Sequence, residues 1–66
     1  MENRMTHTVK FYNANGWHTF EEYGMDYRDE SVRVAQKLAA LFPIVEIHSY
    51  YPWNDETLTE RIHRYE

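Results

Sequence analysis

Four histidines, and a glutamate close to one of them, are the side chains of this sequence best suited to chemistry. The histidines are scattered at His7, His18, His48 and His63, without the spacing of a metal-binding motif. Glu46 and His48 lie two residues apart, so on a strand they point the same way and could form an acid–base couple. We expect no metal site, and we expect this pair to be solvated on an open sheet.

The other reactive residue types do not combine into a catalytic motif. Glu21 and Glu22 are neighbours in a predicted strand, so they point to opposite faces and cannot act as paired carboxylates. The chain has no cysteine and only two glycines, Gly16 and Gly24, which excludes a thiol nucleophile and a glycine-rich phosphate loop. We therefore predict no catalytic residue and no cofactor, and we expect that the protein is not an enzyme.

The elements that position these side chains begin with a hairpin. Asn15-Gly16 tolerates the positive φ angles of a type I′ turn and lies between segments 8–12 and 17–23, which are rich in aromatic and β-branched residues. A two-residue loop at this point pairs Tyr12 with Thr19, Phe11 with Phe20 and Lys10 with Glu21. One face then carries Val9, Phe11, His18 and Phe20, and the other carries Lys10, Tyr12, Trp17, Thr19, Glu21 and Tyr23.

A helix and a third strand follow. Apolar residues recur at helical spacing over 31–42, Asp26 or Asp29 can cap the start, and Pro43 ends the helix. Residues 44–51 alternate as a strand. The prediction is a two-layer α+β fold, a small antiparallel sheet of three to four strands with the first strand central and one helix on one face. The expected core is Val9, Phe11, Phe20, Val34, Ala35, Leu38, Leu41, Phe42, Val45 and Ile47.

The C-terminal segment 55–65 fits two structures. It could be a fourth strand paired with 44–51, which we favour, or a short helix capped by Asn54 or Asp55. The chain has 66 residues, which fits one domain over 1–66 with a small core. Eleven aromatic residues, six Tyr, three Phe and two Trp, are the expected compensation for that small core.

Charge and hydropathy restrict the partners. The net charge of −4 opposes non-specific binding to nucleic acid, which depends on Lys and Arg neutralising phosphates. The start of the sequence lacks the apolar run of a signal peptide, and the longest apolar run, 38–45, is too short to span a bilayer. We therefore expect a cytoplasmic protein that does not bind membranes.

With one helix available, only one face of the sheet can be buried, and the other is expected to carry an aromatic patch. Tyr and Trp often dominate interface energies, so we predict a non-catalytic module that binds a protein partner, or a second copy as a homodimer. These aromatic residues could also serve only to stabilise the sheet, and the C-terminal segment could cover part of them. The predicted contact residues are Tyr12, Trp17, Tyr23 and Tyr50, with Lys10, Glu46 and His48 at the rim.

Two general resemblances of this chain bear on its function. In size and mild acidity the chain is similar to small inhibitors encoded by phages and mobile elements, such as anti-CRISPR proteins. A sheet with exposed aromatics also looks like an RNA-recognition platform, so binding of single-stranded nucleic acid on the sheet face is the alternative function. The strands lack the glycine-aromatic signature of that platform and the chain is acidic, which makes nucleic acid the less favoured partner.

Overall fold

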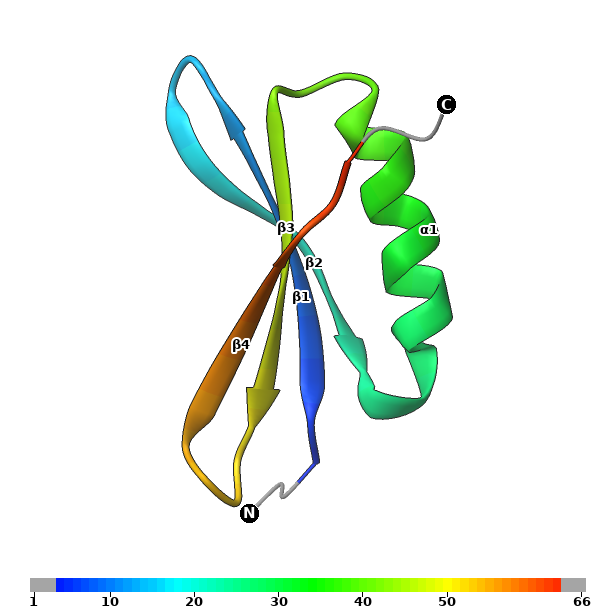
Figure 1. Cartoon of the computed structure of the whole chain (residues 1–66), viewed down its shortest axis with the longest axis vertical. Coiled ribbons are helices and arrows are strands. Elements are labelled where there is room, and N and C mark those ends of the chain that lie inside the picture. Colours follow the sequence, from blue (N-terminus) through cyan, green and yellow to red (C-terminus); the bar gives the residue numbers. More distant parts are fainter. Residues whose placement is uncertain (1–3, 64–66) are drawn as a thin grey trace.

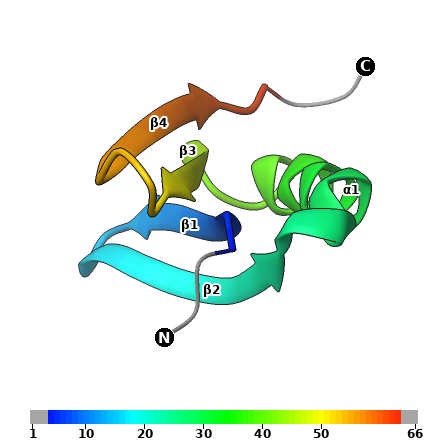
Figure 2. The same ribbon diagram turned by 90° about the horizontal axis from the view of Figure 1, so that it is seen from below.

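The computed structural model describes residues 4–63 and shows a four-stranded antiparallel sheet in the order β2-β1-β3-β4. Figures 1 and 2 show the single helix α1 lying against one face of this twisted sheet. The predicted α+β fold with a central first strand is therefore confirmed. The elements in order are β1 (Thr6–Asn13), β2 (Gly16–Gly24), the 3-10 turn Met25–Tyr27, α1 (Arg28–Ala39), β3 (Ile44–Tyr51) and β4 (Glu56–Arg61).

The hairpin between β1 and β2 forms where it was predicted, but its register differs. Ala14 and Asn15 make the loop, and Asn13 pairs with Gly16, whose φ is 105°. The Asn13 Oδ1 accepts a hydrogen bond of 2.8 Å from the Asn15 amide, as in a type I turn that starts with Asn and ends with Gly. Tyr12 therefore lies opposite Trp17 rather than Thr19. The observed register is shifted by two residues from the predicted one, so Tyr12 and Trp17 stay on the face that was predicted for them.

A β-bulge in β2 then reverses the faces that were predicted for the rest of that strand. Lys10 pairs with Thr19, whereas Val9 pairs with Glu21, so Phe20 is the extra residue. Phe20 was expected in the core, but it is 48% exposed. Tyr23 pairs with His7 and packs against the core on the helix side. The prediction that Tyr23 lies on the open face is wrong because simple alternation does not survive a bulge.

Helix α1 ends at Ala39, three residues before the predicted end at Phe42, and it begins at Arg28, between the starts that caps at Asp26 or Asp29 would give. No side chain caps its start, so the proposed caps are not formed, while the buried Ser31 hydroxyl donates to the Arg28 carbonyl at 2.7 Å. After Ala39 the chain turns over 40–43 into β3, and Leu41 is left 75% exposed. The prediction that Leu41 belongs to the core is wrong, because it assumed that the helical spacing continues to Pro43.

The core lies between α1 and the two central strands. Its fully or nearly fully buried apolar residues are Val9, Ala35, Leu38, Val45 and Ile47, all of them predicted. Phe11, Val34 and Phe42 pack against them while partly buried, and the Phe11 and Phe42 rings stack with centroids 4.3 Å apart. Eight of the ten predicted core residues thus line the helix side of the sheet, which fixes the opposite side as the open face.

The ambiguous C-terminal segment forms a strand over Glu56–Arg61, while Asp55 belongs to the preceding turn and residues 62 and 63 continue beyond the strand. β4 pairs with β3 along its whole length and extends the sheet rather than folding over its open face. The last two positions of the predicted segment, 64 and 65, lie outside the described residues. Within residues 4–63, no helix is long and apolar enough to cross a membrane.

Candidate functional site

The open face of the sheet is a set of rows that run across the strands. The pairing registers place Trp17, Tyr12 and Ile44 in a first row, and Thr19, Lys10, Glu46 and Arg61 in a second. The third row contains Glu22, Thr8, His48 and Thr59, and the fourth contains Thr6, Tyr50 and Thr57 beside Gly24. Six of the seven predicted contact residues therefore share this face, and Tyr23 is the exception.

The first row forms an aromatic end beside the hairpin loop. Trp17 and Tyr12 meet edge to face, with ring centroids 5.5 Å apart and planes inclined by 64°. Trp17 is 47% exposed and Tyr12 39% exposed, so the pair presents a large apolar surface although each ring supports the other. We call these two residues, with the neighbouring Ile44, the aromatic end.

The second and third rows are joined by a polar network around Glu46. One oxygen of the Glu46 carboxylate accepts a bond of 3.0 Å from Arg61, and the other lies 3.0 Å from His48 Nε2. Desolvation of the carboxylate acts to raise the pKa of Glu46, but the hydrogen bonds and charges of Arg61 and His48 together lower it. Lys10 lies directly across from Glu46 on β1. The centre of the face therefore holds a fixed carboxylate among basic side chains.

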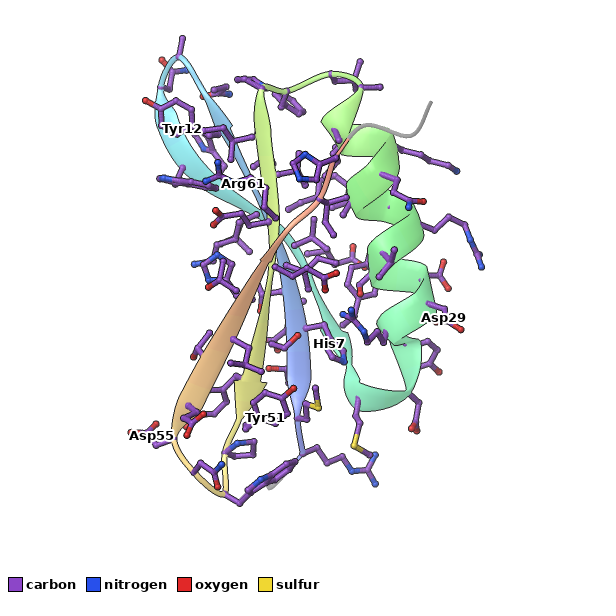
Figure 3. All side chains as sticks on the ribbon, viewed as in Figure 1. His7, Tyr12, Asp29, Tyr51, Asp55 and Arg61 are labelled. Carbon is purple, nitrogen blue, oxygen red and sulfur yellow. The ribbon has the colours of Figure 1, made fainter. Side chains whose placement is uncertain are left out.

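Tyr50 lies at the far end of the face from Trp17. Its row is six positions along β3 from the row of Ile44, or about 20 Å at the rise of a strand. The Tyr50 hydroxyl donates a bond of 2.8 Å to Asp55 in the β3–β4 turn, and this bond with desolvation raises the pKa of the phenol. Figure 3 shows Tyr12 and Asp55 at opposite ends of the molecule. The aromatic contact residues thus lie at the two ends of the face, Trp17 and Tyr12 at one and Tyr50 at the other, with a polar centre between them.

Sequence reasoning missed a buried pair on the helix side, His7 and Ser49. Their side chains meet at 2.7 Å between Nδ1 and Oγ, and both residues are buried. Figure 3 shows His7 between the sheet and α1. Desolvation and the positive charge of Arg28 lower the pKa of His7, although a hydrogen bond with the Met25 backbone opposes this. The alternation of His7 with Val9 and Phe11 was the signal that could have identified this residue as buried.

The other predicted histidine positions are as expected. His18 lies on the helix side, where it stacks on Phe11 at 5.3 Å and contacts the Asn13 Oδ1 at 3.0 Å. His48 lies on the open face with Glu46, but the two side chains are only 27% and 13% exposed and are bonded to each other, so the pair is less solvated than predicted. No three acidic, histidine or cysteine side chains gather at a single point within residues 4–63.

An open pocket of about 410 Å³ lies on the helix side, between the start of α1 and β4. Arg28 and Glu60 form an exposed ion pair of 2.6 Å at this pocket. Ser49, which also lines the pocket, is the residue whose hydroxyl is bonded to the buried His7. The remaining lining residues are Met5, Tyr51, Leu58 and Thr59.

Comparisons of the chain with models of protein families, with curated proteins and with solved structures found no match. The function is therefore inferred from the geometry of the open face alone.

Proposed function

We propose that this protein is a non-catalytic interaction module that binds a protein partner through the open face of its sheet. The observation that supports this most strongly is the edge-to-face pair of Tyr12 and Trp17, which stands exposed on the face that α1 leaves uncovered. In this proposal the aromatic end provides the apolar contact, and Lys10, Glu46 and His48 provide polar contacts beside it. Tyr50 contributes at the other end of the face.

The aromatic end is suited to binding because little order has to be gained when a partner arrives. Trp17 and Tyr12 already hold each other in place, and the β-sheet fixes both backbones. Binding by preordered aromatic side chains costs less conformational entropy than binding by flexible ones. Trp and Tyr are also the residues that most often dominate the energy of a protein interface.

The polar network favours a protein over a nucleic acid as partner. A strand of RNA or DNA needs cations that are available to phosphates. On this face the guanidinium of Arg61 is bonded to Glu46, and Lys10 lies opposite the same carboxylate. A neighbouring carboxylate repels phosphate, whereas a mixed row of charges can pair with charges of both signs on a protein surface. This mode of action would fit an inhibitor of the small phage or mobile-element type.

The test is an affinity capture that compares a variant on the open face with one on the outer side of α1. Trp17→Glu places a charge in the aromatic end, while Lys37→Glu, the control, introduces the same acidic residue at an exposed position of the helix. We expect proteins that are retained by the unaltered chain and by Lys37→Glu to be lost from Trp17→Glu. If Trp17→Glu keeps its circular dichroism spectrum and retains the same proteins, the open face is not the binding surface.

A further inference from the structure

We infer that the free edge of β4 pairs with β4 of a second copy of this chain around a two-fold axis at Thr59. The two sheets then join into one continuous antiparallel sheet. This contact uses the edge of the sheet rather than its open face, so it is independent of the function proposed above. It rests on four features of β4: its outward backbone groups, the ion pairs of Glu60 and Arg61, the lack of cover by any part of residues 4–63, and the self-complementary register.

The outward backbone groups follow from the ladder between β3 and β4. The Ile62 amide donates to the Val45 carbonyl at 2.9 Å, so the backbone of Ile62 faces β3. Residues of an antiparallel strand alternate between facing one neighbour and facing the other. Leu58 and Glu60 therefore face β3, while Thr57, Thr59 and Arg61 direct their N–H and C=O groups to the free edge. This is the template that a further strand needs.

Charges usually protect an edge strand, but two of the three charges on β4 are neutralised from within the chain, and the third, Glu56, is at the first position of the strand. Glu60 is bonded to Arg28 at 2.6 Å, and Arg61 is bonded to Glu46 at 3.0 Å. The centre of the strand, Thr57 to Thr59, carries no charge. Charged side chains on an edge strand normally discourage pairing with another chain. In β4 the charges of Glu60 and Arg61 are already satisfied by partners on the same molecule.

The other edge of the sheet is different. β2 contains the bulge at Phe20, which interrupts the regular ladder, whereas β4 pairs with β3 without a register shift. A bulge twists an edge strand and makes it a poor template. Among residues 4–63, the backbone of α1 lies close to β1, β2 and β3 but not to β4. The side chain of Arg28 reaches Glu60, but the helix itself does not cover this edge. Figure 2 shows β4 at the edge of the sheet farthest from β2.

The register of the dimer follows from charge and from the two-fold symmetry. With Thr59 opposite Thr59 of the second copy, Thr57 lies opposite Arg61 and Leu58 lies opposite Glu60. Every outward-facing residue of β4 then exchanges backbone hydrogen bonds with an outward-facing residue. A register centred on Leu58 instead would place Glu56 opposite Glu60 twice, and like charges directly opposite each other are unfavourable. The arrangement at Thr59 has no such conflict.

The small size of the domain gives a reason for pairing between the β4 strands of two copies. The fully buried apolar residues are few, and Leu58 on β4 is 55% exposed in the single chain. Oligomerisation is one of the routes by which so small a domain gains stability. Edge pairing would cover part of Leu58 and satisfy the free backbone groups of β4, while two open faces would lie side by side on one surface of the dimer.

The first experiment measures the mass in solution by light scattering up to millimolar concentration. We expect the unaltered chain to be a dimer, and we expect Thr59→Pro to be a monomer, because proline removes an N–H that points to the second copy and not to β3. Thr59→Ala keeps that N–H and is the matched control, expected to remain dimeric. A strictly monomeric unaltered chain, or a dimeric Thr59→Pro, overturns the inference.

A charge swap tests the two-fold register itself. Thr59→Lys and Thr59→Glu each place like charges opposite each other in a homodimer, so each variant alone is expected to be monomeric. An equimolar mixture places Lys opposite Glu and is expected to restore the dimer. If the mixture stays monomeric, the register centred on Thr59 is wrong. If Trp17→Glu rather than Thr59→Lys dissociates the chain, the second copy binds at the open face and the inference is wrong.

Discussion

The two faces of this sheet each hold a histidine beside a polar partner, but they use them differently. On the helix side, His7 and Ser49 are buried and bonded to each other, and burial opposes a charge on the ring. On the open face, His48 shares the Glu46 carboxylate with the largely exposed Arg61. The difference teaches that the position of a polar pair relative to the helix, rather than its residue types, decides how far that pair is removed from water.

The largest expected effect is on the helix side, in the apolar core itself. Leu38→Ala removes a buried side chain and should lower the free energy of unfolding by about 2–5 kcal/mol. Leu41→Ala is the matched control, since Leu41 is 75% exposed and the same truncation leaves no cavity. Urea denaturation of both variants measures the difference. Equal stability of the two variants would contradict the arrangement of α1 on the sheet.

The same pair of leucines shows how far the sequence could predict the fold. Helical periodicity correctly identified Leu38 and the contact of the helix with the central strands. It could not locate the end of the helix, because Leu41 continues the apolar spacing for one more turn. Only the path of the chain back into β3 determines that Leu41 faces solvent.

The candidate site was predictable to the same extent. Alternation correctly predicted that Tyr12, Trp17 and Glu46 lie on the open face. For Tyr12 and Trp17 the prediction survived the change of hairpin register, because the register shifted by an even number of residues. Tyr23 was misplaced, because a bulge depends on how the strand twists over the whole sheet and leaves little trace in local composition. The register of β3 against β1 separates Tyr50 from the pair of Tyr12 and Trp17. Alternation along a strand predicts which face a residue lies on, but it does not predict this register.

The second effect tests the buried polar pair. Ser49→Ala removes the hydroxyl that is bonded to His7 at 2.7 Å and leaves a buried ring nitrogen without that partner. An unsatisfied buried polar group costs about 1–3 kcal/mol, so unfolding should become easier by this amount. Thr59→Ala removes an exposed hydroxyl from the neighbouring strand and should cost much less. A loss for Ser49→Ala no larger than that for Thr59→Ala would show that the His7 bond contributes nothing.

The third effect is a pH dependence that originates on the helix side. The pKa of His7 is lowered from its usual 6.5, so the unfolded chain binds the proton more readily than the folded protein. Stability is therefore expected to fall as the pH drops below about 6.5 and to be independent of this group above that pH. A ¹H–¹⁵N NMR titration of the His7 ring checks the cause. A midpoint at or above 6.5 would contradict it.

The smallest effect is expected on the open face, from the network around Glu46. Glu46→Gln removes the charge that Arg61 and His48 share. The Glu46 side chain is only 13% exposed, but Arg61 is 56% exposed, so water screens the ion pair from the Arg61 side. Pairs of this kind contribute up to about 1 kcal/mol, and the loss should shrink as salt is added. Urea denaturation at low and high salt measures both quantities. Glu46→Gln could instead lower the free energy of unfolding as much as Ser49→Ala does, with no dependence on salt. That result would mean that the network stabilises the sheet as a buried pair does. Its charges would then not be available to a partner, and the contrast between the two faces would be wrong.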